Sequence, residues 1–157
     1  MAAHLDFLYE DLSCAENRSY YVRLYGLKDI STRVEQGLSL VGLLDRRNHR
    51  VRTLSNGMQK RLSIARALLH EPLVLLLDEP EAGLDQEALG MLQGVLSNLK
   101  GLGRSAVMTT HNVEIGRLWG DRVAVLSGGQ LDLSDEGRGM ERGTGGTRRD
   151  PTGNVQG

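Results

Sequence analysis

The stretch LSNGMQKRLSIARALLHEPLVLLLDEPEAGLD occupies residues 54–85 and decides how the rest of the chain is interpreted. Its first part, from Ser55 to about His70, places apolar residues at helical spacing. Its second part contains the apolar run LVLLL, which stops at DEP and is typical of a strand buried on both faces. The stretch therefore predicts a helix followed by a core strand, with polar residues at the start of the helix and at the end of the strand.

The flanking segments extend this pattern in two ways. Before the stretch, residues 14–27 and 31–44 predict two helices, the first ended by Gly26. The second helix contains Gly37 and Gly42, which each cost about 1 kcal/mol relative to alanine, so it is expected to need tertiary support. After the stretch, helix and strand alternate over residues 85–99, 105–110, 112–119 and 122–126. Strand–helix–strand order predicts an α/β fold with a mainly parallel sheet.

The bulk composition favours a soluble protein. The formal net charge of the 157 residues is −1, which gives no field that indicates nucleic acid or an anionic membrane as a partner. The single cysteine, Cys14, permits no disulfide within the chain, as in a reducing cytosol. The longest strongly apolar run, Leu73–Leu77, is far shorter than the ~20 residues of a membrane span. The opening MAAHLDFLYEDL lacks the features of a secretion signal, so any membrane role is expected to come through a partner.

The start of the predicted third helix is a candidate anion site. Ser55, Asn56 and Gly57 stand where a helix has unpaired backbone N–H groups and the positive end of its dipole. Together these features bind phosphate readily. An ordinary helix capped by serine explains the same residues, and this segment alone does not separate the two interpretations.

The ends of the predicted strands carry the candidate catalytic groups. An aspartate at the tip of a strand, here Asp78, can hold Mg²⁺, and the neighbouring Glu79 can orient or deprotonate a water that attacks a phosphate. His111 follows the strand SAVMTT and faces the crevice where α/β sheets bind ligands. A solvated turn and a solvated histidine are the plainer alternatives.

Taken in order, these residues resemble the nucleotide-binding subunit of ABC transporters. The matching segments are the signature LSNGMQKR, the Walker B segment LVLLLDEP, the D-loop AGLD and the H-loop TTHN, within a resemblance that covers roughly residues 4–133. It implies a partial P-loop NTPase fold in four parts. A Q-loop remnant occupies residues 1–9, and a helical signature subdomain occupies residues 10–66. The second half of the ATPase core follows at residues 67–133, and a disordered, glycine-rich tail at residues 134–157. The opening HLDFLYEDLSCAENRSYYVRLYGL and the form LSNGMQKR look most like the haem-exporter ATPase of cytochrome c biogenesis.

The resemblance implies that two such subunits, identical or different, sandwich two ATP molecules. Each site pairs the P-loop of one chain with the signature of the other. The signature residues Ser55, Asn56, Gly57 and Gln59 would then contact an ATP held by the partner, and Asp85 would communicate across the dimer.

The resemblance also assigns the strand-end residues and the partners. Asp78 would organise Mg²⁺, Glu79 would be the general base, and His111 would contact the γ-phosphate. Residues 10–66 would dock on an integral membrane permease, which places the subunit on the cytoplasmic face of the membrane. Closure around ATP would drive the permease between states, and no nucleic acid is expected as a partner.

Several positions depart from the family pattern. Asn56 replaces the first glycine of the usual signature and Met58 its glutamine, but asparagine tolerates unusual backbone angles and Gln59 lies one place on. The signature site is therefore expected to survive. Ala82 stands where a polar residue is common, and Leu5 stands where the Q-loop glutamine should lie, which affects Mg²⁺ coordination and signalling to the permease.

The largest departure is the missing P-loop. That motif reads G-x-x-x-x-G-K-[ST], with backbone amides that cradle phosphates and a lysine that neutralises them. The three lysines, Lys28, Lys60 and Lys100, all follow residues other than glycine. Met1 falls about where the Q-loop region of the family begins, so the chain is expected to be N-terminally incomplete, either through a misassigned start or through truncation.

An incomplete sheet has a physical consequence. LVLLL, SAVMTT and RVAVL are expected to be strands of one sheet. If the strands beside them are missing, the sheet has unpaired backbone groups and exposed apolar faces. Such edges and faces promote aggregation. The chain alone is therefore expected to be poorly soluble or molten.

The sequence LSGGQ at residues 126–130 matches the usual signature more closely but is expected to be a turn. It lies between the apolar segments RVAVL and QLDL, and the glycine-rich tail follows instead of a helix. Two apolar segments joined by Ser-Gly-Gly predict a β-hairpin.

Two other functions compete with that of a transporter ATPase. The chain could be a non-catalytic partner that lends Ser55 and Gly57 to the ATP of another subunit. It could also belong to the DNA-repair ATPases of the same superfamily, but sustained heptads and a basic stripe are missing from the sequence.

Overall fold

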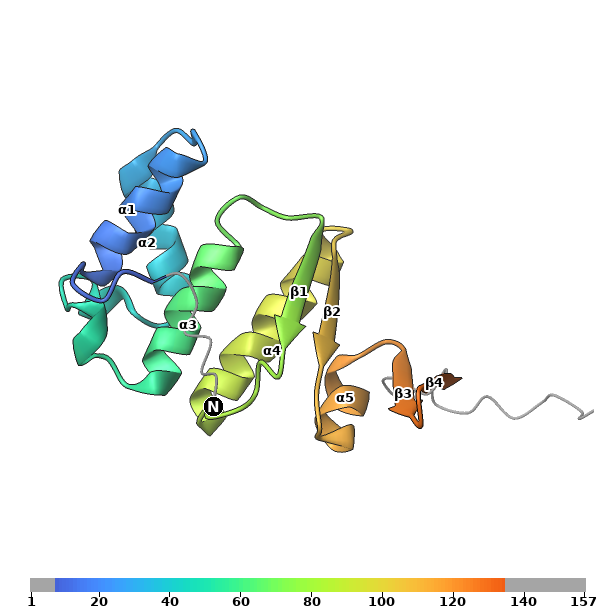
Figure 1. Cartoon of the computed structure of the whole chain (residues 1–157). Helices are drawn as coiled ribbons and strands as arrows, with labels where there is room; N and C mark the ends of the chain where they lie inside the picture. The colour runs from blue at the N-terminus through green and yellow to red at the C-terminus, as the bar shows by residue number, and fades with distance from the viewer. Residues whose placement is uncertain (1–7, 135–157) are drawn as a thin grey trace, which may run out of the picture. The chain divides into compact units, whose positions relative to one another are not determined.

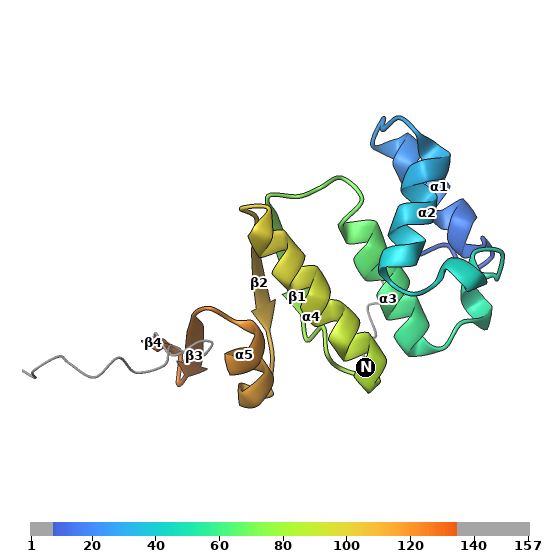
Figure 2. The same cartoon turned by 180° about the vertical axis from the view of Figure 1, so that it is seen from behind.

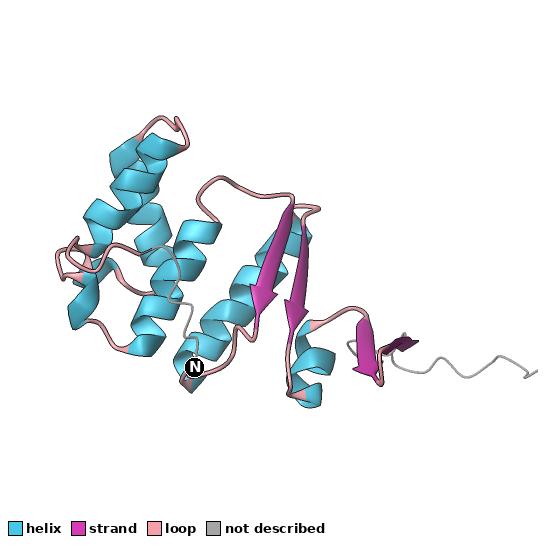
Figure 3. Cartoon of the chain, in the orientation of Figure 1, coloured by secondary structure: helices cyan, strands magenta, loops and turns pink. Residues whose placement is uncertain are grey.

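The computed structural model describes residues 8–134 of the chain. This part begins with helices and continues with alternating helices and strands (Figures 1 and 3). Contacts divide the chain into two compact units, residues 1–115 and 116–157. Most of the expected Q-loop remnant, including Leu5, and nearly all of the expected tail lie outside the described residues. No helix within the described range is long and apolar enough to cross a bilayer.

Three α-helices make up the helical part of the first unit: α1 (Cys14–Leu24), α2 (Ile30–Leu40) and α3 (Asn56–Ala67). Two short 3₁₀ helices, Leu44–Arg46 and Val51–Thr53, connect α2 to α3. The three α-helices occupy the predicted segments, and α3 ends before the predicted His70.

Local caps set the ends of these helices. The α1 helix begins at a capping box, in which Ser13 Oγ accepts from Glu16 N at 3.2 Å and Glu16 Oε2 accepts from Ser13 N at 2.7 Å. Gly26, at φ +66°, ends α1 as predicted, and Gly42, at φ +65°, follows the end of α2. Glu71 turns the chain at φ +53° after α3.

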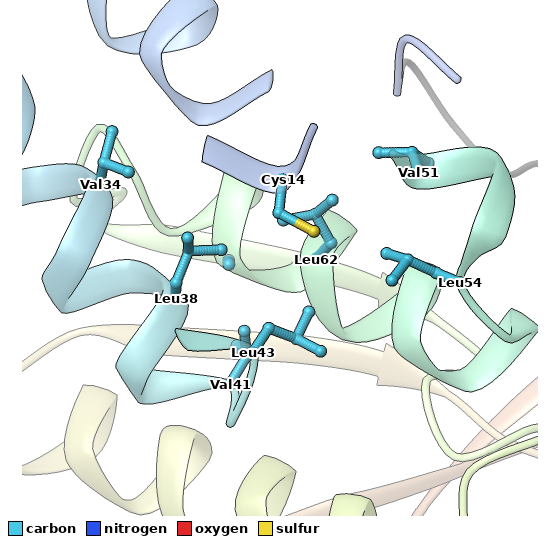
Figure 4. Packing of buried hydrophobic residues seen from close by; sticks show 9 residues of the cluster. Cys14, Val34, Leu38, Val41, Leu43, Val51, Leu54 and Leu62 are labelled. Atoms are coloured by element: carbon cyan, nitrogen blue, oxygen red, sulfur yellow. The ribbon is translucent and has the colours of Figure 1, made fainter. Parts of the chain in front are cut away.

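The largest hydrophobic cluster joins the three helices and the loops between them (Figure 4). The thiol of Cys14, at the start of α1, is buried among side chains from α2, α3 and the 3₁₀ segments. Burial raises the pKa of this thiol. The buried members are Cys14, Val34, Leu38, Val41, Leu43, Val51, Leu54, Leu62 and Ala65.

The sheet of the first unit has two parallel strands, β1 (Val74–Asp78) and β2 (Ser105–Thr109), connected through α4 (Gln86–Gly101). Asp78 pairs with Thr109, so both strands end at one edge of the sheet. Figures 1 and 2 show α4 against one face of the strands, where Leu75 of β1 packs on Val95 and Leu99 of α4.

The other face of β1 is exposed, which corrects the prediction that LVLLL is buried on both faces. Leu75 is 4% exposed, whereas Leu76 is 75% exposed. Val74, which lies on the same face as Leu76, is also more than half exposed. The reason is that α4 covers only one side of the strand, and the predicted exposed apolar face is therefore confirmed.

The second unit contains an antiparallel hairpin of β3 (Val123–Ser127) and β4 (Gln130–Ser134), and α5 (Val113–Trp119) precedes it. Gly128 and Gly129 form its turn with φ of +56° and +78°, so the sequence LSGGQ is a hairpin turn as predicted. In the described residues β3 forms its ladder with the adjacent β4, and the expectation that RVAVL also joins the parallel sheet stays a prediction.

Candidate functional site

The carboxyl ends of β1 and β2 bring the predicted strand-end residues together. Opposite Asp78 in the register, Thr109 donates a hydrogen bond from Oγ1 to Asp78 Oδ1. Glu79 N donates to Thr109 O at 3.1 Å. The imidazole of His111 then reaches Glu79, with Nε2 2.8 Å from Oε1. Both side chains remain open to solvent, 91% for His111 and 45% for Glu79, so a ligand can reach them.

Glu79 has an unusual backbone conformation. Its φ of +41° lies in the left-handed region, which costs a non-glycine residue about 1–3 kcal/mol unless the surroundings hold it. Hydrogen bonds hold it on both sides. Its N–H donates to the carbonyl and the hydroxyl of Thr109, and its carbonyl accepts from Lys60 Nζ at 2.5 Å. The backbone at Glu79 is thus fixed by two other elements, β2 and α3.

The start of α3 forms the second part of the site. Ser55 is the N-cap, and its Oγ accepts from Met58 N at 3.3 Å, as the plainer interpretation of a capped helix expects. The free N–H groups of this first turn remain available to an anion. An open hollow of about 300 Å³ lies beside it, lined by Ser55, Asn56, Gly57, Met58, Arg61, Gly83, Asp85 and Ala88.

The hollow brings the predicted signature and D-loop segments into contact within one chain. A Cβ added to Gly57 would lie 3.3 Å from Gly83 O, so α3 approaches the turn at residues 82–85 closely. Asp85 ends that turn as the N-cap of α4, and its Oδ1 accepts from Ala88 N at 2.8 Å.

Gln59 is the one predicted signature residue outside the lining of the hollow. Its Nε2 donates to the carbonyls of Val51 and Leu54, both at 3.2 Å. The side chain therefore turns back toward the loop before α3. This placement favours a structural role for Gln59 over contact with a ligand in the hollow.

The sequence interpretation missed Lys60 and Thr109 as parts of this arrangement. Lys60 was considered only as a candidate P-loop lysine, yet it contacts the backbone of Glu79 and Ala82. Thr109 was assigned to a strand, and its position opposite Asp78 follows only from the register. The one available signal was that SAVMTT ends in two hydroxyl residues at a strand tip.

The site offers Mg²⁺ the single carboxylate of Asp78 rather than a set of protein ligands. Within residues 8–134, acidic, histidine and cysteine side chains nowhere gather in a group of three that could hold a metal ion. Asp78 is exposed at the strand tip and can bind a hydrated Mg²⁺ whose remaining ligands are water and phosphate oxygens. The residues therefore fit an ion that arrives with a nucleotide rather than one held in a protein cage.

Comparison with known proteins connects this geometry to a family. A family model described as ABC transporter matches residues 1–82, just over half of the chain. The chain belongs to the ABC transporter family. This membership confirms the predicted α/β class and P-loop NTPase fold, of which β1, α4 and β2 form part.

Among curated ABC proteins, similarity extends over about four fifths of the chain. It is 41% identical to ABC transporter A family member 7 of Dictyostelium discoideum, over 80% of this chain and 15% of that protein. It is 38% identical to the human phospholipid-transporting ATPase ABCA3, over 80% of this chain and 8% of that protein. It is 30% identical to the linearmycin resistance ATP-binding protein LnrL of Bacillus subtilis (strain 168), over 79% of this chain and 40% of that protein.

The chain thus corresponds to less than half the length of these ABC relatives. These relatives do not support the predicted likeness to a haem-exporter ATPase. Their names refer to the ABC transporter A family, to phospholipid transport and to linearmycin resistance.

Proposed function

We propose that this chain is an ATP-binding subunit of an ABC transporter, which couples ATP hydrolysis to transport through a separate permease on the cytoplasmic face of the membrane. The observation that carries the proposal is the cluster at the strand tips. Glu79 and His111 touch at 2.8 Å, next to Asp78 and open to solvent. A carboxylate base beside a histidine, adjacent to a carboxylate suited to Mg²⁺, is arranged for attack of water on a phosphate.

The residues of the chain divide the work in this proposal. The N–H groups at the start of α3 bind phosphate oxygens of an ATP held by a second ATPase subunit. Glu79 accepts a proton from water, and His111 orients its carboxylate or contacts the phosphate. Bound Mg²⁺ supplies positive charge that neutralises the phosphates, and Asp78 is the residue that would hold it.

A second function is favoured by one specific observation. None of the three lysines follows glycine, so the sequence holds no G-x-x-x-x-G-K-[ST] motif to cradle phosphates. Residues 1–157 taken by themselves suit the role of a non-catalytic partner that lends Ser55 and Gly57 to an ATP bound by another subunit.

One experiment tests both functions. A fluorescent ATP analogue with Mg²⁺ is titrated into the purified chain alone. It is also titrated into a mixture of the chain and a P-loop-bearing ABC subunit whose own signature serine is replaced. We expect no saturable binding by the chain alone, and restored hydrolysis in the mixture that is lost with Ser55→Ala. If Glu79→Gln leaves the restored rate unchanged, the chain acts only as a lender of its signature. Failure of the unmutated chain to restore any hydrolysis would count against both functions.

A further inference from the structure

The ammonium group of Lys60 lies between two parts of the site that are far apart in sequence. Lys60 is on α3, and its Nζ donates to Glu79 O at 2.5 Å and to Ala82 O at 3.1 Å. One cation thus binds two carbonyls of the turn that follows β1. A long, flexible side chain with three donors suits this task.

We propose that Lys60 is a positioning residue that clamps this turn, residues 79–82, to α3, so that the start of α3 and the backbone of Glu79 move as one body. The proposal deepens the proposed function, on which its relevance to ATP rests. In that setting, contact of a phosphate with the start of α3 is transmitted within the same chain to the residue that activates water.

A close approach of α3 to the chain just after this turn supports the clamp. Gly57 precedes Lys60 by three residues, so the two lie on one face of α3. At Gly57 the helix approaches the carbonyl of Gly83 so closely that an added Cβ would lie 3.3 Å from it. A close approach at one point and a charged hydrogen bond at another, one helical turn apart, restrict both sliding and rotation of the turn against α3.

The clamp restrains the unusual backbone conformation of Glu79. A non-glycine residue at φ +41° tends to relax unless its peptide groups are restrained. Thr109 restrains the N–H of Glu79, and Lys60 restrains its carbonyl. Without Lys60 one of these two restraints on the backbone of Glu79 is lost.

Charge supports the placement of Lys60. Burial lowers the pKa of its ammonium group, and the carboxylates of Glu81, Glu79 and Asp78 offset part of this effect by favouring the charged form. All three carboxylates belong to the end of β1 or to the clamped turn. The electrostatic attraction therefore acts in the same direction as the hydrogen bonds.

Hydrogen exchange of the full 157-residue chain, without nucleotide, tests the clamp. In Lys60→Met we expect the amides of Glu79, Ala82 and Leu84 to exchange roughly tenfold faster, because a hydrogen bond to a charged group is lost. The amides of α1 should keep their rates. Lys60→Arg should restore most of the protection, since guanidinium can also donate to two carbonyls, and Lys28→Met, at an exposed lysine, should change nothing.

Two results would overturn the clamp. One is unchanged exchange at residues 79–84 in Lys60→Met. The other is faster exchange throughout α1, α2 and α3, which would make Lys60 a general determinant of folding. Neither of these exchange results depends on ATP. If the unmutated chain fails to restore hydrolysis, the proposed function is rejected, but hydrogen exchange still decides whether Lys60 clamps the turn.

Discussion

At the scale of single residues, the buried guanidinium of Arg18 explains a glycine inside α2. Arg18 is 4% exposed and donates to Ala65 O at 2.5 Å and to Arg33 O at 2.9 Å, which joins α1 to α2 and α3. Burial lowers its pKa to about 10. The guanidinium lies against Gly37, where an added Cβ would be 1.9 Å from one of its nitrogens. This contact is part of the tertiary support expected for α2, together with the burial of Val34 and Leu38.

The contact predicts that alanine at Gly37 is destabilising. Glycine to alanine inside a helix normally stabilises a protein by up to about 1 kcal/mol. Gly37→Ala should instead lower the free energy of unfolding by about 1–3 kcal/mol, because a buried group must move. Gly94→Ala in α4, where no atom beyond the neighbouring residues and the backbone of the helix itself lies within 4 Å of the added Cβ, should raise it. Urea denaturation followed by circular dichroism compares the two, and shifts of the same sign would contradict the prediction.

Glu71 carries a prediction about pH. It accepts from Arg104 at 3.1 Å and from Arg33 at 3.3 Å, and these two cations hold the pKa of its carboxyl below the ordinary 4.5. Because the folded state depresses this pKa, the stabilising contribution is present above pH 4.5 and is lost as the pH falls through the depressed value. The side chain is exposed, so the contribution is small and screened by salt.

The measurement is the free energy of unfolding of the natural chain minus that of Glu71→Gln, at neutral pH and at about pH 3. The difference should be positive at neutral pH, smaller in high salt, and close to zero in acid. An equal difference at both pH values would show that Glu71 acts through its shape rather than its charge.

Sequence reasoning predicted correctly where residues lie when their position follows from their place along the chain. Asp78, Glu79 and His111 stand at strand ends, and parallel strands bring such ends to one edge. It missed Lys60 and Arg18 because their partners lie 19 and 47 residues away and are fixed only by packing between elements. A long side chain can reach many partners, and composition does not select among them.

At the scale of elements, β1 shows what an apolar run leaves undetermined. Five consecutive apolar residues precede Asp78, and their pattern is compatible with burial on either face or on both. Only the arrangement of α4 makes Leu75 buried and Leu76 exposed. The hairpin of β3 and β4 was easier to predict, because a two-residue glycine turn determines its local pairing.

The two neighbouring leucines of β1 therefore predict opposite outcomes for the same substitution. Leu76→Lys should change the free energy of unfolding by no more than about 0.5 kcal/mol and should lower the binding of a hydrophobic dye. Leu75→Lys should cost about 3 kcal/mol or more, because it places an unpaired charge between β1 and α4. Denaturation and dye fluorescence measure both effects. Equal destabilisation by the two variants would mean that the second face of β1 is also covered.

At the scale of the whole molecule, buried apolar contacts are concentrated in the first unit. The described hydrophobic clusters draw their members from residues 8–99. In the second unit the hairpin exposes four large apolar side chains, Val125, Leu126, Leu131 and Leu133. A two-stranded hairpin without a covered face is marginally stable at best.

This distribution predicts a gradient of local stability along the chain. Amides of α1 and α3 should open only with the main unfolding transition, whereas amides of β3 and β4 should exchange through local opening at a free energy close to zero. Hydrogen exchange of the intact chain, resolved by peptide and compared with unfolding by urea, measures both. Protection of β3 equal to that of α3 would contradict the prediction. It would imply that the exposed leucines of the hairpin are covered in solution.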